Sequence, residues 1–277
     1  LKKGKKRVFV GAKLPKRTAA AAQVAPILRG LVALPGSSEG SYKRMVMDFR
    51  TSKTVRAFVD GKDVKRYSQQ GTATPDHVIR TKQKPLIVPA PVADDLDGFA
   101  RGAARALKAY QKSYHAYFER QNKRQETPKT ELDAMPRLIL VPGLGLFGLG
   151  ANAKAAGIAA DLGETNVMVI TGAESMSSYK VIGERDCFDL EYWSLEQAKL
   201  AKGAEAPLAR RVAIISGGGG GIGAAAARAF AAEGAAVAVL DRDAGAVARV
   251  AAEIGASAIG IACDVTDAKA VRRAFDQ

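Results

Sequence analysis

Histidine and cysteine are scarce in this sequence of 277 residues, which contains only two of each. The cysteines, Cys187 and Cys263, form no C-x-x-C pair, which indicates structural thiols in a reducing cytoplasm rather than a disulfide framework. The histidines, His77 and His115, form no H-x-H pair and are too few for a three-histidine zinc site. The sequence therefore predicts a cytoplasmic protein with no metal site of its own.

Long hydrophobic runs are also missing. The longest uncharged stretches are residues 138–153 and 212–227, and both are rich in glycine. Each is shorter than the roughly 20 apolar residues that a membrane-spanning helix needs. Because hydrophobic residues still make up 47% of the chain, the sequence predicts about two domains with apolar cores and no membrane partner.

Acidic residues are absent from the first 38 positions. Residues 1–90 carry 20 Lys and Arg against five acidic residues, whereas residues 91–277 carry 22 against 23. A basic region of this kind is typical of binding to nucleic acid, an anionic membrane or a phosphorylated substrate. Few aromatic residues lie among these charges, so we expect no nucleic-acid partner. Contact with a substrate phosphate remains open.

The most informative pattern that is present is VAIISGGGGGIG, at residues 212–223. Its β-branched start predicts a buried parallel strand, and residues 224–233 predict a helix directly after the glycines. Glycines allow a tight turn and a close approach to a pyrophosphate, and the helix N-terminus supplies free N–H groups. The residues expected to bind a nicotinamide dinucleotide in this turn are Ser216, Gly217, Gly221, Ile222 and Gly223.

A second strand is predicted at residues 235–240 and is followed by Asp241. A carboxylate at the tip of this strand can accept hydrogen bonds from the ribose hydroxyls of NAD and repel the 2′-phosphate of NADP. Arg242 would weaken that repulsion, so we expect NAD with only a moderate preference. A helix at residues 244–254 and a third strand at 257–262 continue the alternation of a doubly wound parallel sheet.

The Ser216-Gly217-x-x-x-Gly221-x-Gly223 pattern resembles the Thr-Gly-x-x-x-Gly-x-Gly signature of short-chain dehydrogenases. The resemblance implies that Asp264 and Val265, after the third strand, hold the adenine ring. That family also uses a catalytic Tyr-x-x-x-Lys, but no tyrosine in this sequence has a lysine four positions later. The resemblance therefore covers the cofactor half of the domain and supplies no catalytic residue.

A rival glycine motif, GLGLFG, lies at residues 143–148. Residues 138–141 predict a strand before it, and residues 152–162 and 167–170 predict a helix and a second strand after it, as in another dinucleotide fold. The turn itself is bulky and apolar. We therefore favour a closely packed pair of strands, which explains the glycines as well.

Several further elements are expected in the first two thirds of the chain. Residues 55–59 predict a strand, 71–82 a polar loop that enters a strand, 99–124 a long helix, and 189–201 an amphipathic helix. The aromatic side chains of the long helix are expected to pack in the core; they are Tyr110, Tyr114, Tyr117 and Phe118.

His77 lies near Asp76, Arg80 and Lys82, which suggests a phosphate-binding catalytic group. We favour a histidine with structural hydrogen bonds, because it has no partner at ligand spacing. His115 is expected at the surface.

Four segments together resemble the bifunctional rhamnulose-1-phosphate aldolase/short-chain dehydrogenase family. They are TPDHVIRTK at 74–82, VPGLGLFGLG at 141–150, FDLEYWSLEQAKL at 188–200 and PLARRVAIISGG at 207–218. The resemblance implies an α/β chain in which residues 1–205 are an incomplete class II aldolase/adducin-like region. Residues 206–277 would then be the N-terminal half of a Rossmann domain. It also implies a zinc site in an upstream aldolase half, a sugar phosphate or small aldehyde as substrate, and a homo-oligomer.

Two functional hypotheses follow. The first is the NAD-binding part of a bifunctional aldolase and lactaldehyde dehydrogenase, truncated at both ends and inactive as a dehydrogenase on its own. The second is a non-catalytic fragment that binds nucleotide or assembles with a partner. In both, we expect the last 70 or so residues to be marginally stable, because three strands leave an open edge and bury little surface.

Overall fold

The computed structural model describes residues 8–36, 40–200 and 205–277, with the side chains of Pro75 and Asp76 left out. These residues form two compact units. The first unit comprises the described residues of Leu1–Ala19, Asp48–Leu149 and Ile158–Lys202. The second comprises those of Ala20–Met47, Gly150–Gly157 and Gly203–Gln277.

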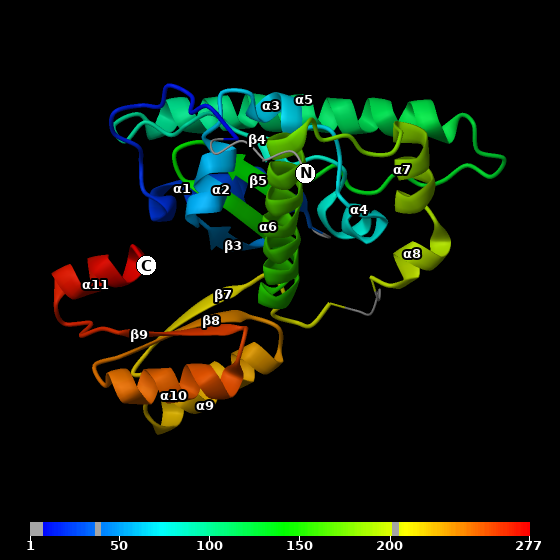
Figure 1. Ribbon diagram of the computed structural model, residues 1–277. Coiled ribbons are helices and arrows are strands. Elements are labelled where there is room, and N and C mark those ends of the chain that lie inside the picture. Colours follow the sequence, from blue (N-terminus) through cyan, green and yellow to red (C-terminus); the bar gives the residue numbers. More distant parts are fainter. Residues whose placement is uncertain (1–7, 37–39, 201–204) are drawn as a thin grey trace. The chain divides into compact units, whose positions relative to one another are not determined.

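The first unit is built around a mixed sheet with strand order β3-β6-β5-β4 (Figure 1). The strands are β3 (Val46–Arg50), β4 (Leu86–Ile87), β5 (Leu138–Val141) and β6 (Gly145–Gly150). The helices are α2 (Lys53–Val59), α3 (Val64–Tyr67), α4 (Pro75–Thr81), α5 (Leu96–Asn122), α6 (Ala153–Met176), α7 (Glu184–Glu191) and α8 (Ser194–Ala198). Strand β4 pairs parallel with β5, and β5 pairs antiparallel with β6.

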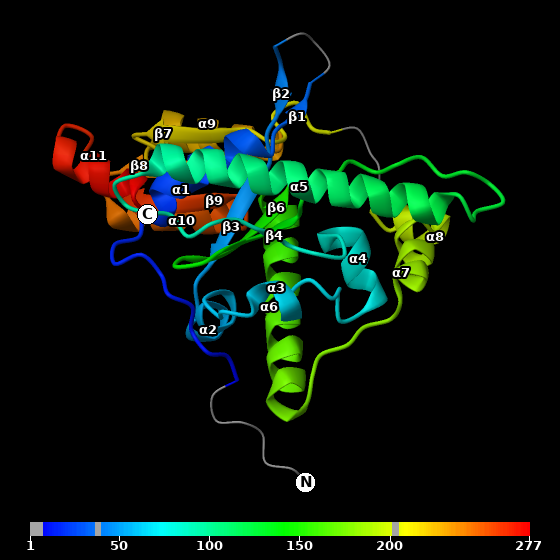
Figure 2. The same cartoon turned by 90° about the horizontal axis from the view of Figure 1, so that it is seen from above.

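Helices close the core of this unit. Figures 1 and 2 show the long helix α5 lying along β4, and α6 running across the direction of α5. Side chains from α2, α3 and α6 pack on Leu140 of β5 and Leu146 of β6; they include Val55, Phe58, Tyr67, Val167 and Ile170. A second, aromatic cluster joins α5 to α7, through Tyr114, Tyr117, Phe118, Phe188 and Tyr192. Every position of β5 and β6 is buried.

The second unit contains a parallel sheet with order β7-β8-β9. Its elements are α1 (Ala21–Leu31), β1 (Leu34–Pro35), β2 (Tyr42–Lys43), β7 (Val212–Ser216), α9 (Gly221–Ala232), β8 (Ala236–Asp241), α10 (Ala244–Ile254), β9 (Ala258–Ala262) and α11 (Ala268–Phe275). Helices α9 and α10 cover one face of the sheet, and α11 lies on the other (Figure 1). Strand and helix alternate here as predicted.

Four predictions for the first two thirds of the chain are wrong in local structure. Residues 55–59 belong to helix α2, because Ser52 caps it by accepting a hydrogen bond from the Val55 N–H at 3.3 Å. Residues 71–82 contain helix α4, which begins at Pro75, the position at which proline is favoured.

Residues 167–170 continue helix α6 instead of forming a strand. Buried positions recur along it at helical spacing: Ala156, Ala160, Val167 and Ile170. Packing on the sheet thus overrides the β-branched composition. The helix predicted at 189–201 is broken between Glu191 and Ser194, where Trp193 adopts an extended conformation at the N-cap position of α8. The last residue of that prediction, Ala201, lies outside the described residues. The helix predicted at 99–124 and the strand at 138–141 are confirmed.

Candidate dinucleotide-binding site

The glycine turn connects the end of β7 to the start of α9. Gly217 has a φ of +64°, a conformation that glycine adopts without strain. A Cβ atom on Gly223 would collide with the carbonyl oxygen of Gly217. The first turn of α9 therefore lies directly against the backbone of the loop, and both positions require glycine.

Three backbone donors are free at the N-terminus of α9. Within the described part of the chain, the N–H groups of Gly221, Ile222 and Gly223 have no hydrogen-bond acceptor. A Cβ atom on Gly221 would meet nothing within 4 Å, and the Ile222 side chain is 90% exposed. Unpaired donors at the positive end of a helix, beside open space, form an anion-binding site.

Asp241, at the end of β8, is held by the same turn. Its Oδ2 accepts the Gly219 N–H at 3.1 Å, and its Oδ1 accepts the Asp243 N–H at 3.2 Å. These hydrogen bonds, that from Asp243 above all, and the nearby Arg242 hold the pKa of the carboxyl below its usual value. The carboxylate is therefore ionised at neutral pH, and its remaining lone pairs can accept hydrogen bonds from hydroxyl groups.

Asp264 follows β9 at the same edge of the sheet. Its Oδ1 accepts both the hydroxyl of Thr266 at 2.7 Å and the Thr266 N–H at 2.9 Å. These bonds, chiefly the one from the hydroxyl, lower the pKa of Asp264. Val265, next to it, is 51% exposed.

Because the three strands are parallel and adjacent, their carboxyl ends bring all the predicted contacts to one edge. Ser216 ends β7, Asp241 ends β8, and Asp264 follows β9. The contact of Gly219 with Asp241, which fixes the carboxylate against the turn, was not predicted from the sequence. The uninterrupted glycine run was the available signal, since a Cβ on Gly219 would lie 2.7 Å from that of Ala246.

The rival glycine motif forms a hairpin. Strands β5 and β6 pair through Leu138 with Gly148 and Val141 with Gly145, and every position of both strands is buried. Gly145 has a φ of +151°, and a Cβ there would collide with the carbonyl oxygen of Arg50. The favoured interpretation, close packing of a strand pair, is therefore confirmed.

His77 is buried in the first unit, with 7% of its surface exposed. Its Nδ1 lies 3.2 Å from Oδ1 of Asn166, which also accepts the Ala73 N–H at 3.0 Å. Because that oxygen is an acceptor, Nδ1 of His77 carries the proton. This structural hydrogen bond matches the favoured interpretation. His115 is exposed beside Glu131, as expected.

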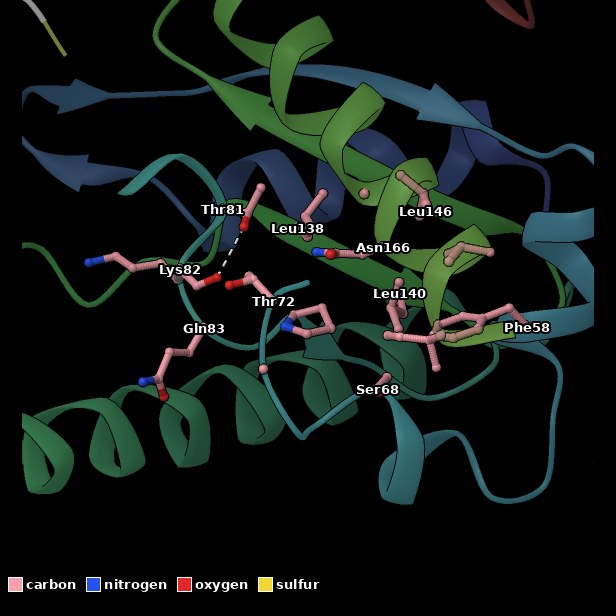
Figure 3. Close-up of a pocket in the computed structure, with 15 residues that line it drawn as sticks. Phe58, Ser68, Thr72, Thr81, Lys82, Gln83, Leu138, Leu140, Leu146 and Asn166 are labelled. Carbon is pink, nitrogen blue, oxygen red and sulfur yellow. Dashed lines mark hydrogen bonds between the residues drawn. The ribbon is translucent and has the colours of Figure 1, made fainter. Parts of the chain in front are cut away.

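The cavity lined by Asn166, the hydrogen-bond partner of His77, is too small for a substrate. It has a volume of about 30 Å³, close to the space of a single water molecule in the liquid. In Figure 3, the Lys82 side chain points away from Asn166, and the Thr81 hydroxyl donates to the Lys82 carbonyl oxygen at 3.1 Å. The proposed grouping of His77 with Lys82 around a phosphate is therefore not assembled.

Lys82 instead belongs to a buried polar network. Its ammonium donates to the Tyr114 hydroxyl at 2.7 Å and lies 3.5 Å from Glu191. Tyr114 and Tyr117 donate to the two carboxylate oxygens of Glu191 at 2.8 and 3.0 Å, and Tyr192 contacts the Tyr114 hydroxyl at 2.8 Å. Burial lowers the pKa of Lys82 to about 8, against the opposing effect of Glu191. The aromatic stripe of α5 is thus in the core, as predicted, but it also carries hydrogen bonds that the sequence analysis missed.

Metal ligands do not cluster in the described ranges. Among those residues, no group of three or more His, Cys, Asp or Glu is placed to hold a metal ion.

None of the described helices combines the length and the apolar character that a membrane span needs.

Two family models match the chain. Residues 19–200 match "Aldolase class II, second domain", and residues 211–277 match "short chain dehydrogenase". The chain therefore belongs to the class II aldolase second-domain family, fused here to a short-chain dehydrogenase segment. This confirms the two-part architecture and the α/β fold class inferred from the sequence.

One curated relative is an uncharacterized oxidoreductase, YuxG, of Bacillus subtilis. It is 32% identical over 269 residues, which cover 95% of this chain and 38% of the relative. This chain thus spans well under half the length of that protein.

The solved structures that match include two bacterial enzymes. A hydroxysteroid dehydrogenase from Escherichia coli is 39% identical over 23% of this chain and 28% of its own, with a TM-score of 0.23. A 3-ketoacyl-(acyl-carrier-protein) reductase from Brucella melitensis, complexed with NADH, is 41% identical over 25% of this chain and 28% of its own, with a TM-score of 0.24.

Proposed function

We propose that residues 206–277 bind a nicotinamide dinucleotide, as the cofactor half of a short-chain dehydrogenase. The observation that carries this proposal is the position of the Asp241 carboxylate, which the Gly219 N–H fixes beside the free donors of α9. A pyrophosphate and a ribose of one dinucleotide require this combination of donors and acceptor.

Different residues would bind different parts of the cofactor. The N–H groups of Gly221, Ile222 and Gly223 would bind the pyrophosphate, with Ser216 and Gly217 shaping the turn. Asp241 would accept the ribose hydroxyls and repel a 2′-phosphate, a repulsion that Arg242 moderates. This favours NAD over NADP. Asp264 and Val265 would border the adenine ring.

Hydride transfer is the chemistry that a bound nicotinamide supplies. In the sequence given, no tyrosine stands in a Tyr-x-x-x-Lys pattern. That absence supports a binding role for this segment, and it is the specific observation in favour of the second hypothesis, a non-catalytic nucleotide-binding or assembly fragment.

For the whole protein, we propose a bifunctional enzyme that cleaves a sugar phosphate such as rhamnulose 1-phosphate and oxidises the resulting lactaldehyde. The fusion of an aldolase domain to a dehydrogenase segment supports this proposal. A zinc site in the aldolase half, a homo-oligomer, a cytoplasmic location, and a boundary between residues 205 and 206 belong to the same proposal.

Calorimetric titration with NADH and NADPH tests the binding proposal. We expect NADH to bind the purified chain at least about tenfold more tightly than NADPH, and Asp241→Asn to reduce that ratio by about tenfold, because it removes the carboxylate charge. Asp276→Asn is the matched control, since it removes the same charge from an exposed position at the end of α11. Unchanged selectivity in Asp241→Asn would contradict the assignment.

A turnover assay separates binding from catalysis. We expect residues 1–277 to bind NAD but to produce no NADH from lactaldehyde. Lactaldehyde-dependent NADH formation that disappears in Asp241→Asn would show that this chain already contains a complete dehydrogenase site.

A further inference from the structure

The second unit contains a basic cleft that the dinucleotide proposal does not use. Its volume is about 260 Å³. Its lining comes from the end of α1, from β2 and from the segment that leads into β7; the charged residues are Arg29, Lys43, Arg44, Glu205, Arg210 and Arg211. Five of these residues are cationic and only one is acidic.

Arg29 is the best positioned of the cations. Its Nε donates to the carbonyl oxygen of Met45 and its Nη2 to that of Arg210, both at 2.9 Å. Carbonyl oxygens fix the guanidinium without neutralising its charge. Burial lowers the pKa of Arg29, and the nearby charges of Arg44 and Arg211 lower it further. The folded protein thus holds like charges together around this cleft at an electrostatic cost.

The one acid in the cleft is already engaged. Glu205 accepts hydrogen bonds from Nε and Nη2 of Arg210, the shortest at 2.6 Å. The remaining Nη1 of Arg210 is buried and has no acceptor in the described structure. Lys43, Arg44 and Arg211 are exposed, and no carboxylate among the described residues is paired with them. The cleft therefore has a surplus of positive charge and of unused donors.

We infer that this cleft binds a phosphate dianion, either free or as the phosphoryl group of a small metabolite. Guanidinium groups match the geometry of phosphate oxygens, and a dianion would relieve the repulsion among Arg29, Arg44 and Arg211. The volume is near the lower end of the range for small-ligand pockets. Tyr42 is the only aromatic residue in the lining, so the cleft lacks the stacking surfaces that single-stranded nucleic acid uses.

This site is distinct from the cofactor turn. Val212, in the cleft, begins β7, and Ser216 ends the same strand at the glycine turn. The four residue steps between them span roughly 13 Å in an extended strand. A phosphate in the cleft therefore lies at the amino end of the sheet, whereas the dinucleotide pyrophosphate would lie at the carboxyl end.

Titration of the full chain with inorganic phosphate at constant ionic strength tests the inference. We expect one saturable site per chain, and a loss of affinity of roughly tenfold in both Arg44→Gln and Arg211→Gln, because each removes a charged donor. Arg249→Gln should bind as the wild type does. It removes the same charge from an exposed position on α10, outside the cleft. Arg29→Gln should weaken binding further, provided that circular dichroism shows a folded protein.

Three outcomes would overturn the inference. They are the absence of saturable phosphate binding, a phosphate affinity in both Arg44→Gln and Arg211→Gln equal to that of the wild type, and displacement of phosphate by saturating NADH. Titration with glycerol phosphate distinguishes the two sources of the ligand. Binding as tight as that of inorganic phosphate supports a phosphorylated metabolite, and much weaker binding supports free phosphate. Both results must depend on Arg44 and Arg211.

Discussion

The two units bury their strands to different degrees, although the strands have similar sequences. LILV in β5 is buried at every position, and Ile139 has no exposed surface. VAIIS in β7 alternates, and Ile214 is 50% exposed. An apolar, β-branched run therefore indicates a strand but does not show whether both faces of the strand are covered.

The cause lies in what packs on each sheet. In the second unit, α9 and α10 bury Val239 and its neighbours, while three large side chains on the opposite face remain at least half exposed: Val212, Ile214 and Ile259. The charged side chains of the two units differ in exposure in the same way. Lys82 and Glu191 are enclosed in the first unit, with 6% and 1% of their side-chain surfaces exposed, whereas Asp241 lies at an open rim.

Removal of the Glu191 carboxylate should have the largest effect on stability. In Glu191→Ala, Lys82 would stay buried without its counter-ion, and Tyr114 and Tyr117 would lose their acceptor. We expect the free energy of unfolding to fall by about 3–5 kcal/mol. Denaturant unfolding followed by fluorescence measures this in the first unit, because the only tryptophan, Trp193, belongs to that unit.

Glu184, on the same helix, provides the matched control. It pairs with Arg120 at 3.0 Å, and both side chains are more than one third exposed. Solvent screens such a pair, so Glu184→Ala should cost no more than about 1 kcal/mol. Equal losses in the two variants would show that the buried network contributes no more than a surface ion pair.

The dinucleotide fold could be predicted from the sequence because its signals are local. Strand, glycine turn, helix and terminal Asp241 follow one another within a single βαβ unit, and each is decided by neighbouring residues. The charged network could not be predicted in the same way. Lys82, Tyr114 and Glu191 are far apart in the chain, and only tertiary packing brings them together.

The wrong secondary-structure predictions have the same explanation. Val55 and Val59 suit a strand by propensity, but the Ser52 cap and burial on β5 and β6 favour a helix. Likewise, Val167 and Ile170 lie on the buried side of α6. Burial could not be inferred from composition, since it depends on which surface each helix covers.

Truncation of one isoleucine in each unit should sharpen the difference in burial. Ile139→Ala should cost about 2–5 kcal/mol, because it leaves a cavity in a closed core. Ile214→Ala removes a half-exposed side chain and should cost less than about 1 kcal/mol. Tryptophan fluorescence reports the first change, and amide hydrogen exchange of β7 and β8 reports the second. A similar loss at Ile214 would mean that its exposed face is covered in solution.

The expected marginal stability of the last 70 or so residues is tested by the same exchange data. If β7 to β9 open more readily than β5 and β6 in the wild type, the open sheet face limits stability. Equal protection of the two sheets would contradict that expectation.

The pH dependence of stability should come mainly from the first unit. Lys82 has a pKa of about 8 in the folded protein, below its ordinary 10.5. The unfolded chain therefore binds more protons than the folded chain between these values, so the free energy of unfolding should rise from pH 8 to pH 10.5. This extra stability is lost as the pH falls back through 8. The full rise is roughly 3 kcal/mol.

The tyrosines act in the opposite direction above pH 10. Burial raises the pKa of Tyr192 from 10 to about 12, so its contribution is lost as the pH rises between these values. Stability measured by Trp193 fluorescence should therefore pass through a maximum near pH 10. Lys82→Met should remove the rise and keep the fall, because only the ammonium is lost. If the rise persists in Lys82→Met, then a group outside the buried network causes it, and the contrast between enclosed and exposed charges does not control the pH response.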